Sequence, residues 1–459
     1  MSRYTSATDA DRREMLAAIG AGSIDELFEG IPAGVRLERE LDLPAGMSES
    51  EVYERLRALA QRNADAESEL CFIGAGMYDH YVPAIVDAIT SRSEFLTPYT
   101  PYQPEISQGT LQTMFEFQTA ISELMGLPVA NAGLYEGPSS VASAGYLAIA
   151  ATGRRRFLAS RGVHPQSRET LLTYSDGFGA EVAEVGLRDG LTDAEALAAA
   201  LDDQTAAVFL QQPNFLGSVE DVAALAERAH DVGALVVVAA DPIAAGVLRP
   251  PGECGADVAV GEGQPLGGRL DYGGPSFGFF AATDEHIRRM PGRIAGETSD
   301  VDGRRGFVLA LQTREQHIRR EKATHNICTS QQLNALAGVI YLSWLGKRGL
   351  VELGELLVQR AAYARDRLAG LDGVELLHGA PVVREFAVRL DAPVGEVLDL
   401  CAADGIAAGY PLGREYPEHE DGLLVAITER RTRDDIDRLA DSLGAAVAKA
   451  GGRVAEVAR

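Results

Sequence analysis

The sequence predicts an α/β protein with a mostly parallel sheet covered by helices, followed by a smaller α+β domain. Between about residues 130 and 330, uninterrupted apolar runs alternate with segments of helical periodicity. Strands that are covered by helices on both faces need such continuous apolar runs, because a polar side chain on either face could not reach water. From about residue 335, two long helical segments precede isolated strands, which is typical of an α+β domain.

The elements follow from this patterning. We expect strands at 171–174, 206–211, 234–240, 257–260, 277–282, 384–390 and 423–428. We expect helices at 8–19, 48–62, 139–151, 219–229, 332–345, 350–371, 395–404 and 433–449. The resulting division is an N-terminal helical arm (1–65) that packs on a neighbouring domain or subunit, a large α/β domain (66–330) and a small C-terminal α+β domain (331–459).

Charge is the most unusual feature of the composition. The net charge is −25, and Lys322, Lys347 and Lys449 are the only lysines among the 459 residues. Such a surface disfavours nucleic acids and anionic membranes. The balance also fits a salt-rich cytoplasm, where counter-ions screen carboxylate repulsion, or simply an acidic mesophilic protein. A melting temperature that rises with molar salt would support the salt-rich host.

The sequence favours a cytoplasmic protein without a metal site. Its first residues are polar and unlike a signal peptide, and no apolar run reaches transmembrane length. Cys71, Cys254, Cys328 and Cys401 lie far apart and lack metal-type spacing. We expect them to be reduced and buried.

Residues 97–108 (TPYTPYQPEISQ), here called the polyproline segment, carry a proline at every third position from 98 to 104. This period matches the three-residue turn of a polyproline helix, on which Tyr99, Tyr102 and Glu105 share one ridge. Two phenols in line with a carboxylate suit the lining of a polar cleft. The alternative is a Pro-rich loop that only leads into the amphipathic helix after Ser107, its expected N-cap.

Two further segments carry candidate polar groups. A turn within 71–83 is expected to bring Tyr78, Asp79 and His80 near the polyproline segment, although a lone histidine is commonly structural. The run 311–324 mixes cations and anions closely. It predicts either a solvated helix with pairs such as Glu315–Arg319, or an anion clamp built on arginine's forked donors.

Asp241 directly follows the buried strand expected at 234–240. A chain of this length and organisation with a strand-end aspartate resembles fold-type I pyridoxal-phosphate (PLP) enzymes, whose aspartate pairs with the pyridinium nitrogen. Those enzymes also hold the cofactor aldehyde on a lysine as a Schiff base. Here Gln264 stands about where that lysine is expected, and no lysine precedes Lys322.

Five blocks resemble one family more closely: 97–108, 248–253, 272–275, 290–293 and 311–329. They are similar to the N-terminal half of glycine decarboxylase, the P-protein of the glycine cleavage system. In many prokaryotes this family is split into two subunits, and the chain resembles subunit 1 from about residue 5 to its end. The family's lysine-bearing half is subunit 2, which is consistent with Gln264 here.

The resemblance implies an activity shared with that partner. Subunit 2 would bind PLP covalently, glycine would be decarboxylated, and the aminomethyl group would pass to the lipoyl arm of H protein. A heterotetramer of two of each subunit is implied. The family's glycine-rich phosphate cup corresponds to Gly137-Pro138-Ser139-Ser140, where Pro138 removes one donor and makes phosphate binding by this chain doubtful.

The candidate site residues then fall into three groups. Tyr99, Tyr102 and Glu105 are the expected catalytic contribution to the partner's site. Residues expected to face substrate or cofactor across the interface are Thr100, Gln103, Ser107, Gln108, Arg314 and His317. Asp241 and Gln264 would mark a degenerate cofactor site.

Two alternatives stay open on sequence grounds. One is a self-sufficient PLP decarboxylase or aminotransferase that uses Lys322 as its imine lysine. The other is a non-catalytic scaffold that only stabilises subunit 2.

Overall fold

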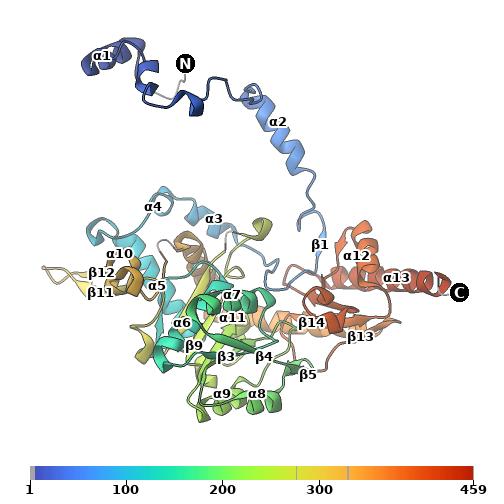
Figure 1. Cartoon of the computed structure of the whole chain (residues 1–459). Coiled ribbons are helices and arrows are strands. Elements are labelled where there is room, and N and C mark those ends of the chain that lie inside the picture. Colours follow the sequence, from blue (N-terminus) through green and yellow to red (C-terminus); the bar gives the residue numbers. More distant parts are fainter. Residues whose placement is uncertain (1–5, 275, 328–329, 458–459) are drawn as a thin grey trace. The chain divides into compact units, whose positions relative to one another are not determined.

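The computed structural model describes residues 6–274, 276–327 and 330–457, with side chains described up to residue 452 (Figure 1). The chain divides into two compact units, Met1–Ala64 and Asp65–Arg459. The first contains α1 (Asp9–Ile19) and α2 (Glu49–Ala60), which both begin with a reciprocal capping box. No residue of either helix is buried, and residues 6–64, the described part of this unit, contain no hydrophobic core.

The second unit is built on a seven-stranded sheet of order β2-β10-β9-β8-β7-β3-β4. Its strands are β2 (Val129–Ala130), β3 (Arg156–Ser160), β4 (Glu181–Val185), β7 (Thr205–Gln212), β8 (Leu235–Ala240), β9 (Val258–Glu262) and β10 (Gly278–Ala282). Strands β4, β3, β7, β8 and β9 run parallel, whereas β10 is antiparallel to both β9 and β2. The expected α/β class with a mostly parallel sheet is confirmed.

Helices surround this sheet (Figure 1). The helices of this part of the chain are α3 (Ala84–Thr90), α4 (Ser93–Leu96), α5 (Gln108–Met125), α6 (Gly137–Thr152), α7 (Pro165–Phe178), α8 (Ala194–Ala200), α9 (Val222–Asp231), α10 (Gln316–Arg319) and α11 (Gln332–Ala369); α4 and α10 lie away from the sheet. Side chains alternate along each strand: in β7, Phe209 packs with α6 and α7, while Val208 and Leu210 pack with α5, α9 and α11. Both faces are therefore apolar, which explains the uninterrupted apolar runs.

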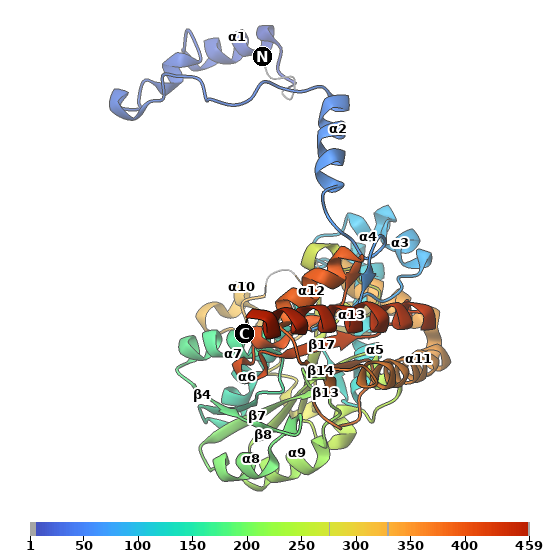
Figure 2. The same cartoon turned by 90° about the vertical axis from the view of Figure 1, so that its right-hand side faces the viewer.

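A second sheet of order β13-β14-β17-β16 follows. Its elements are β13 (Val374–Leu376), β14 (Glu385–Leu390), β16 (Tyr410–Pro411) and β17 (Gly422–Ala426), with α12 (Val394–Ala403) and α13 (Arg433–Val457) covering one face (Figure 2). The remaining strands are β1 (Leu70–Cys71) paired with β15 (Ile406–Ala407), the hairpin β5 (Leu187–Arg188) and β6 (Leu191–Thr192), and the hairpin β11 (Ile294–Ser299) and β12 (Arg305–Ala310). The two large sheets have separate apolar clusters, and we keep the expected division at residue 330 as a prediction.

Most expected elements form, but the strand expected at 171–174 is wrong. These residues lie inside α7, which begins with Pro165 at its first position and ends at Gly179 in left-handed geometry. An apolar run of this length is equally compatible with a short strand and with one buried turn of a helix, so its length could not distinguish a strand from a helix. The helices expected at 332–345 and 350–371 are continuous in α11 except at Gly346, where φ is 63° and ψ is 177°.

Among the described residues, no helix is both long and apolar enough to span a bilayer.

Candidate functional site

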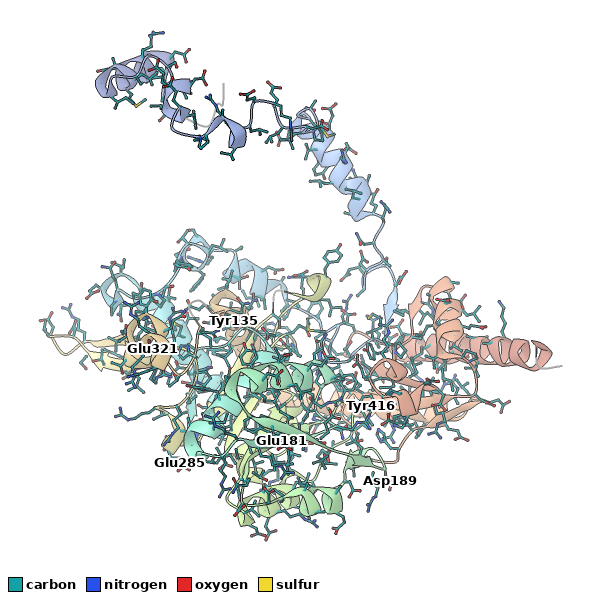
Figure 3. The ribbon with its side chains drawn as sticks, in the orientation of Figure 1. Tyr135, Glu181, Asp189, Glu285, Glu321 and Tyr416 are labelled. Carbon is teal, nitrogen blue, oxygen red and sulfur yellow. The ribbon has the colours of Figure 1, made fainter. Side chains whose placement is uncertain are left out.

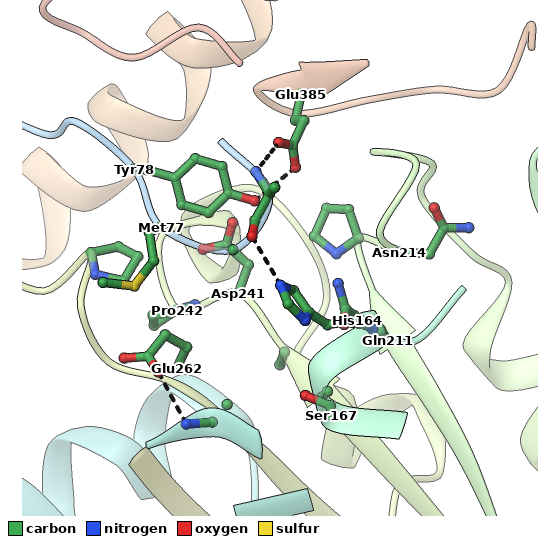
Figure 4. A pocket seen from close by; sticks show the side chains of 18 of the residues that line it. Met77, Tyr78, His164, Ser167, Gln211, Asn214, Asp241, Pro242, Glu262 and Glu385 are labelled. Atoms are coloured by element: carbon green, nitrogen blue, oxygen red, sulfur yellow. Dashed lines mark hydrogen bonds between the residues drawn. The ribbon is translucent and has the colours of Figure 1, made fainter. Parts of the chain in front are cut away.

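A pocket of about 140 Å³ lies at the carboxyl ends of β7, β8 and β9 (Figure 4). The N-termini of α6 and α7, the segment 75–78 and the start of β14 complete its walls. Ligands of parallel α/β sheets bind at this edge, so the pocket lies where the strand-end aspartate predicted it.

Asp241 lines the pocket, but its charge is already paired. Its Oδ2 atom lies 2.5 Å from Nη2 of Arg384, and its Oδ1 atom accepts the N–H of Ile243 at 2.9 Å. The Arg384 side chain is buried, and its guanidinium lies 3.4 Å from the centroid of the Tyr78 ring. A cofactor nitrogen would have to displace this arginine to reach Asp241.

The segment 78–80 joins this buried network. Arg384 donates from Nη1 to Nε2 of His80 at 2.5 Å, so the other ring nitrogen, Nδ1, carries the proton and donates to Glu429 at 2.6 Å. Asp79 pairs with Arg430 and, at 3.2 Å, with Arg431. The charges of this turn are thus paired with the second sheet and the loop after β17, and its expected place beside the polyproline segment stays a prediction.

Glu385 closes the pocket on the side of the second sheet (Figure 4). Its two oxygens accept the N–H of Ala75 and the hydroxyl of Tyr78, both at 2.7 Å. Burial raises the pKa of Glu385 to about 7, against the lowering effect of these donors and of Arg384.

Gln264 does not face the pocket as a lysine substitute would. Its Nε2 donates to the carbonyl oxygens of Tyr78 and Gly268, and its Oε1 accepts the Tyr78 N–H, each at 2.9 Å. The side chain is completely buried. Gln264 therefore ties the loop after β9 to the segment that carries Tyr78.

The N-terminus of α6, where a phosphate cup was expected, is occupied by carboxylates. Glu262 accepts the N–H of Gly137 at 3.0 Å, and Glu136 accepts the N–H of Ser139 at 3.0 Å. Pro138 has no N–H to offer. A phosphate would meet two carboxylates instead of free donors, so like charge excludes it.

This pocket does not fit PLP. Its aspartate is paired with Arg384, its phosphate position holds Glu136 and Glu262, and no lysine lines it. Lys322, the alternative imine lysine, is exposed in the turn after α10 and does not line the pocket; its neighbour Glu321 is labelled in Figure 3.

The polyproline segment lies elsewhere, between α4 and α5. Residues 97–103 form neither helix nor strand, and Pro104–Ile106 form a single 3₁₀ turn, so a polyproline helix could extend no further than Gln103. Tyr99 is 73% exposed and Tyr102 42% exposed, and Glu105 is exposed as well. The expected ridge of two phenols and a carboxylate thus faces outward in this chain.

Three separate sequence blocks meet at Tyr102. Its hydroxyl accepts a hydrogen bond from Nη2 of Arg293 at 3.2 Å, and its ring lies 5.3 Å from that of His317. Nε of Arg293 lies 3.5 Å from Glu315 Oε2, and Nδ1 of His317 lies 3.6 Å from the same oxygen. Glu315 is buried, so the solvated helix with a Glu315–Arg319 pair is not what forms.

Other expected site residues serve the chain itself. Gln108 exchanges two hydrogen bonds with the backbone of Phe307, at 2.8 and 2.9 Å, and so fixes the start of α5 to β12. Ser107 occupies the N-cap position but its hydroxyl does not cap the helix.

Arg314 is buried and donates to the carbonyl oxygens of Met290 and Gly292, so its terminal nitrogens are not free for the expected anion clamp. Thr100 is half-buried and Gln103 exposed.

The cysteines depart partly from expectation. The three described cysteines are free; Cys401 is buried, whereas Cys71 and Cys254 are half-buried. Cys328 lies outside the described residues. Within the described ranges, no group of three or more His, Cys, Asp or Glu side chains is placed to hold a metal ion.

Comparison with known proteins decides the family. The family model described as glycine cleavage system P-protein matches residues 2–443. The chain belongs to the glycine cleavage system P-protein family. A P-protein relative from Geotalea uraniireducens, named probable glycine dehydrogenase (decarboxylating) subunit 1, is 51% identical over 97% of this chain and 100% of its own length. A relative of the same name from Halalkalibacterium halodurans is 48% identical over 96% of this chain and 99% of its own.

Solved structures support the same family and the expected fold. A crystal structure of glycine decarboxylase (P-protein) in inhibitor-bound form is 43% identical, with a TM-score of 0.90 over 97% of this chain and 100% of that one. A sphingosine-1-phosphate lyase from Burkholderia pseudomallei has a TM-score of 0.66 at 17% identity over 93% of this chain and 97% of that one, a likeness in fold alone. The P-protein family thus carries the fold-type I architecture expected from sequence.

Sequence reasoning missed Arg384, Glu385, Glu262 and Arg293. Arg384 and Glu385 are adjacent in an otherwise apolar run, whereas Glu262 and Arg293 each follow a glycine. Arg293, Arg384 and Glu385 are buried and Glu262 is half-buried, which the sequence does not reveal. Arg293 lies in the block 290–293, which carried the family resemblance without any assigned role.

Proposed function

We propose that this chain is subunit 1 of a glycine dehydrogenase (decarboxylating), working with a lysine-bearing subunit 2 in the glycine cleavage system. Full-length relatives carry that name. The observation that carries the proposal is a contrast between two sites. In the strand-end pocket Asp241 is paired with Arg384 within the chain, whereas the polyproline segment presents Tyr99, Tyr102 and Glu105 at the surface.

In this proposal PLP is bound covalently by subunit 2 and supplies the electron sink for the loss of carbon dioxide from glycine. The polyproline segment of this chain covers the partner's site. Its phenols donate hydrogen bonds to substrate or cofactor oxygens, and its apolar ring faces exclude water from the reacting carboxylate. The aminomethyl product passes to the lipoyl arm of H protein, within a complex of two copies of each subunit.

The test compares this chain alone, subunit 2 alone and the two purified together. Exchange of label between bicarbonate and the carboxyl group of glycine measures the decarboxylation step. We expect exchange only from the complex, and no visible absorbance band that borohydride removes when this chain alone is mixed with PLP. Exchange by this chain alone would overturn the proposal.

A substitution at Glu105 distinguishes a catalytic contribution of the polyproline segment from a subunit that only stabilises its partner. Glu105→Gln keeps the shape of the side chain and removes its charge, so we expect at least a tenfold loss of exchange by the complex at unchanged subunit association. Glu94→Gln is the control, because Glu94 is exposed on neighbouring α4 in a surface pair with Arg92. Full activity of both variants, or of subunit 2 alone, would support the scaffold instead.

A further inference from the structure

Tyr102 and the three side chains of Arg293, Glu315 and His317 form a closed set of contacts drawn from three distant segments. Tyr102 lies in the polyproline segment, Arg293 precedes β11, and Glu315 and His317 flank the start of α10. Each contacts two others: Arg293 contacts Tyr102 and Glu315, and His317 contacts the same two. Arg293 and Glu315 are buried, whereas Tyr102 and His317 are both about two-fifths exposed.

Arg293 determines the hydrogen-bonding role of the Tyr102 hydroxyl. A guanidinium has donors only, so the phenol oxygen must act as acceptor in this hydrogen bond. The O–H of Tyr102 is then left to donate to a different group. The guanidinium also lies 5.4 Å from the centroid of the phenol ring, which fixes the ring as well as the oxygen.

Arg293 is itself held rigidly. Its backbone oxygen accepts the N–H of Ala132 at 2.8 Å, and Asn131 donates to the oxygen of Pro291 at 3.0 Å. Arg314 donates to the carbonyl oxygens of Met290 and Gly292, the residues on either side of Pro291. The loop before β11 is therefore clamped from two directions.

The surroundings carry excess positive charge. Arg293 and Arg314 are buried with Glu315, the carboxylate that acts on the pKa of Arg314. Burial, together with the charges of Arg314 and Arg293, lowers the pKa of the nearby His325 to about 4. Two buried cations beside one carboxylate favour an anion at the neighbouring surface.

We propose that Arg293, Glu315 and His317 are positioning residues that orient the Tyr102 hydroxyl as a donor to an anionic oxygen in the partner subunit's site. This inference rests on the proposed function and deepens it. The acceptor belongs to the carboxylate or phosphate class, and its two sources are the carboxylate of glycine and the phosphate of PLP. Preorganised donors of this kind act without reorganisation when charge must be bound.

The test is a double-mutant cycle in the complex with subunit 2, using Tyr102→Phe, Arg293→Met and the pair together. If Arg293 acts through Tyr102, each single change lowers exchange roughly tenfold to a hundredfold, and the double variant is no worse than the more impaired single one. Additive losses would overturn the proposal. Arg293→Lys, which keeps charge but loses the fork, should recover part of the loss.

The source of the anion follows from two readouts. A rise in the KM for glycine at unchanged PLP affinity identifies the substrate carboxylate. Weaker retention of PLP on titration, followed by its absorbance, identifies the cofactor phosphate. If neither the KM nor the PLP affinity of Tyr102→Phe changes, the proposal is wrong.

Arg305→Met is the matched control. Arg305 lies on β12 with its guanidinium 5.0 Å from the Phe307 ring and paired to Glu297, but it is exposed and does not contact Tyr102. We expect it to retain full exchange. If Arg293→Met does not fold, the cycle with the half-exposed His317→Gln and Tyr102→Phe gives the same test. A wild-type complex without exchange would instead contradict the proposed function.

Discussion

At the scale of single residues, Glu385 is a buried carboxyl group that joins the segment 75–78 to the second sheet. Burial raises its pKa to about 7, above the value of about 4.3 expected in the unfolded chain. The folded state therefore binds a proton that the unfolded state has released in this pH window. Its contribution is fully present below the unfolded pKa and is lost as pH rises through about 7.

We predict that Glu385→Gln flattens the fall of stability between about pH 5 and pH 8 by roughly 3 kcal/mol. The amide can keep one acceptor and one donor but cannot ionise. Urea unfolding across this range measures the effect, with the exposed Glu420→Gln as a control that keeps the wild-type slope. Parallel wild-type and Glu385→Gln profiles would contradict the assignment.

Gln264→Lys tests whether the missing lysine is the only obstacle to cofactor binding. We predict no borohydride-sensitive visible band with PLP, because Asp241 remains paired with Arg384 and Glu262 remains at the α6 terminus. The variant should also unfold at lower urea concentration, since the Tyr78 N–H loses its acceptor. A stable adduct mapped to position 264 would show that the pocket still accepts the cofactor.

At the scale of elements, the break in α11 depends on Gly346. Its φ of 63° and ψ of 177° fall in a region that only glycine enters readily, and an added Cβ would meet no atom within 4 Å. Any cost of a side chain here is therefore backbone strain alone. Residues on both sides of the break pack into the apolar cluster of the large sheet, and Ala364 and Leu368, nearer the end of α11, pack into that of the second sheet.

We predict that Gly346→Ala lowers the free energy of unfolding by about 1–3 kcal/mol. Gly395→Ala, inside α12 with open space around its Cβ, should be neutral or stabilising by up to about 1 kcal/mol. Thermal or urea unfolding of both variants provides the comparison. Equal effects would mean that backbone geometry at position 346 is not restrictive.

At the scale of the whole molecule, the first 64 residues form a separate unit, whose described residues, 6–64, contain no buried core. Its large exposed apolar side chains are Met15, Ile19, Ile24, Leu27, Phe28, Ile31, Val35, Leu37, Leu41, Leu43, Met47, Val52, Tyr53, Leu56 and Leu59. Helices of this length are marginal in water unless an apolar face is packed. We therefore expect a neighbouring domain or subunit to cover them, as the sequence pattern of an arm suggested, and a partner subunit is the case that can be tested.

We predict that a chain lacking residues 1–64 stays folded but associates with subunit 2 at least tenfold more weakly. Residues 65–459 contain the apolar clusters of both sheets, so circular dichroism and the unfolding midpoint should change little. Sedimentation of mixed subunits measures association. Unchanged association would show that the arm is covered in some other way.

Much of the fold was predictable because burial leaves a local pattern. The runs that became β7, β8 and β9 are apolar on both faces, and α6, α9 and α12 show helical spacing. The segment 171–174 was mistaken for a strand because a short apolar run carries no period. The strand β3 has one arginine and one serine in five residues and was not expected at all.

The sequence by itself determined that this chain cannot anchor PLP through a Schiff base at the strand ends, because no lysine precedes position 322. Its motifs also indicated the family that the comparisons show. Only the tertiary structure decided that Arg384 neutralises Asp241, that Glu262 blocks the α6 terminus, and that Arg293 and His317 meet at Tyr102. Ion pairs between distant segments depend on how the elements pack, and local patterns carry no record of that packing.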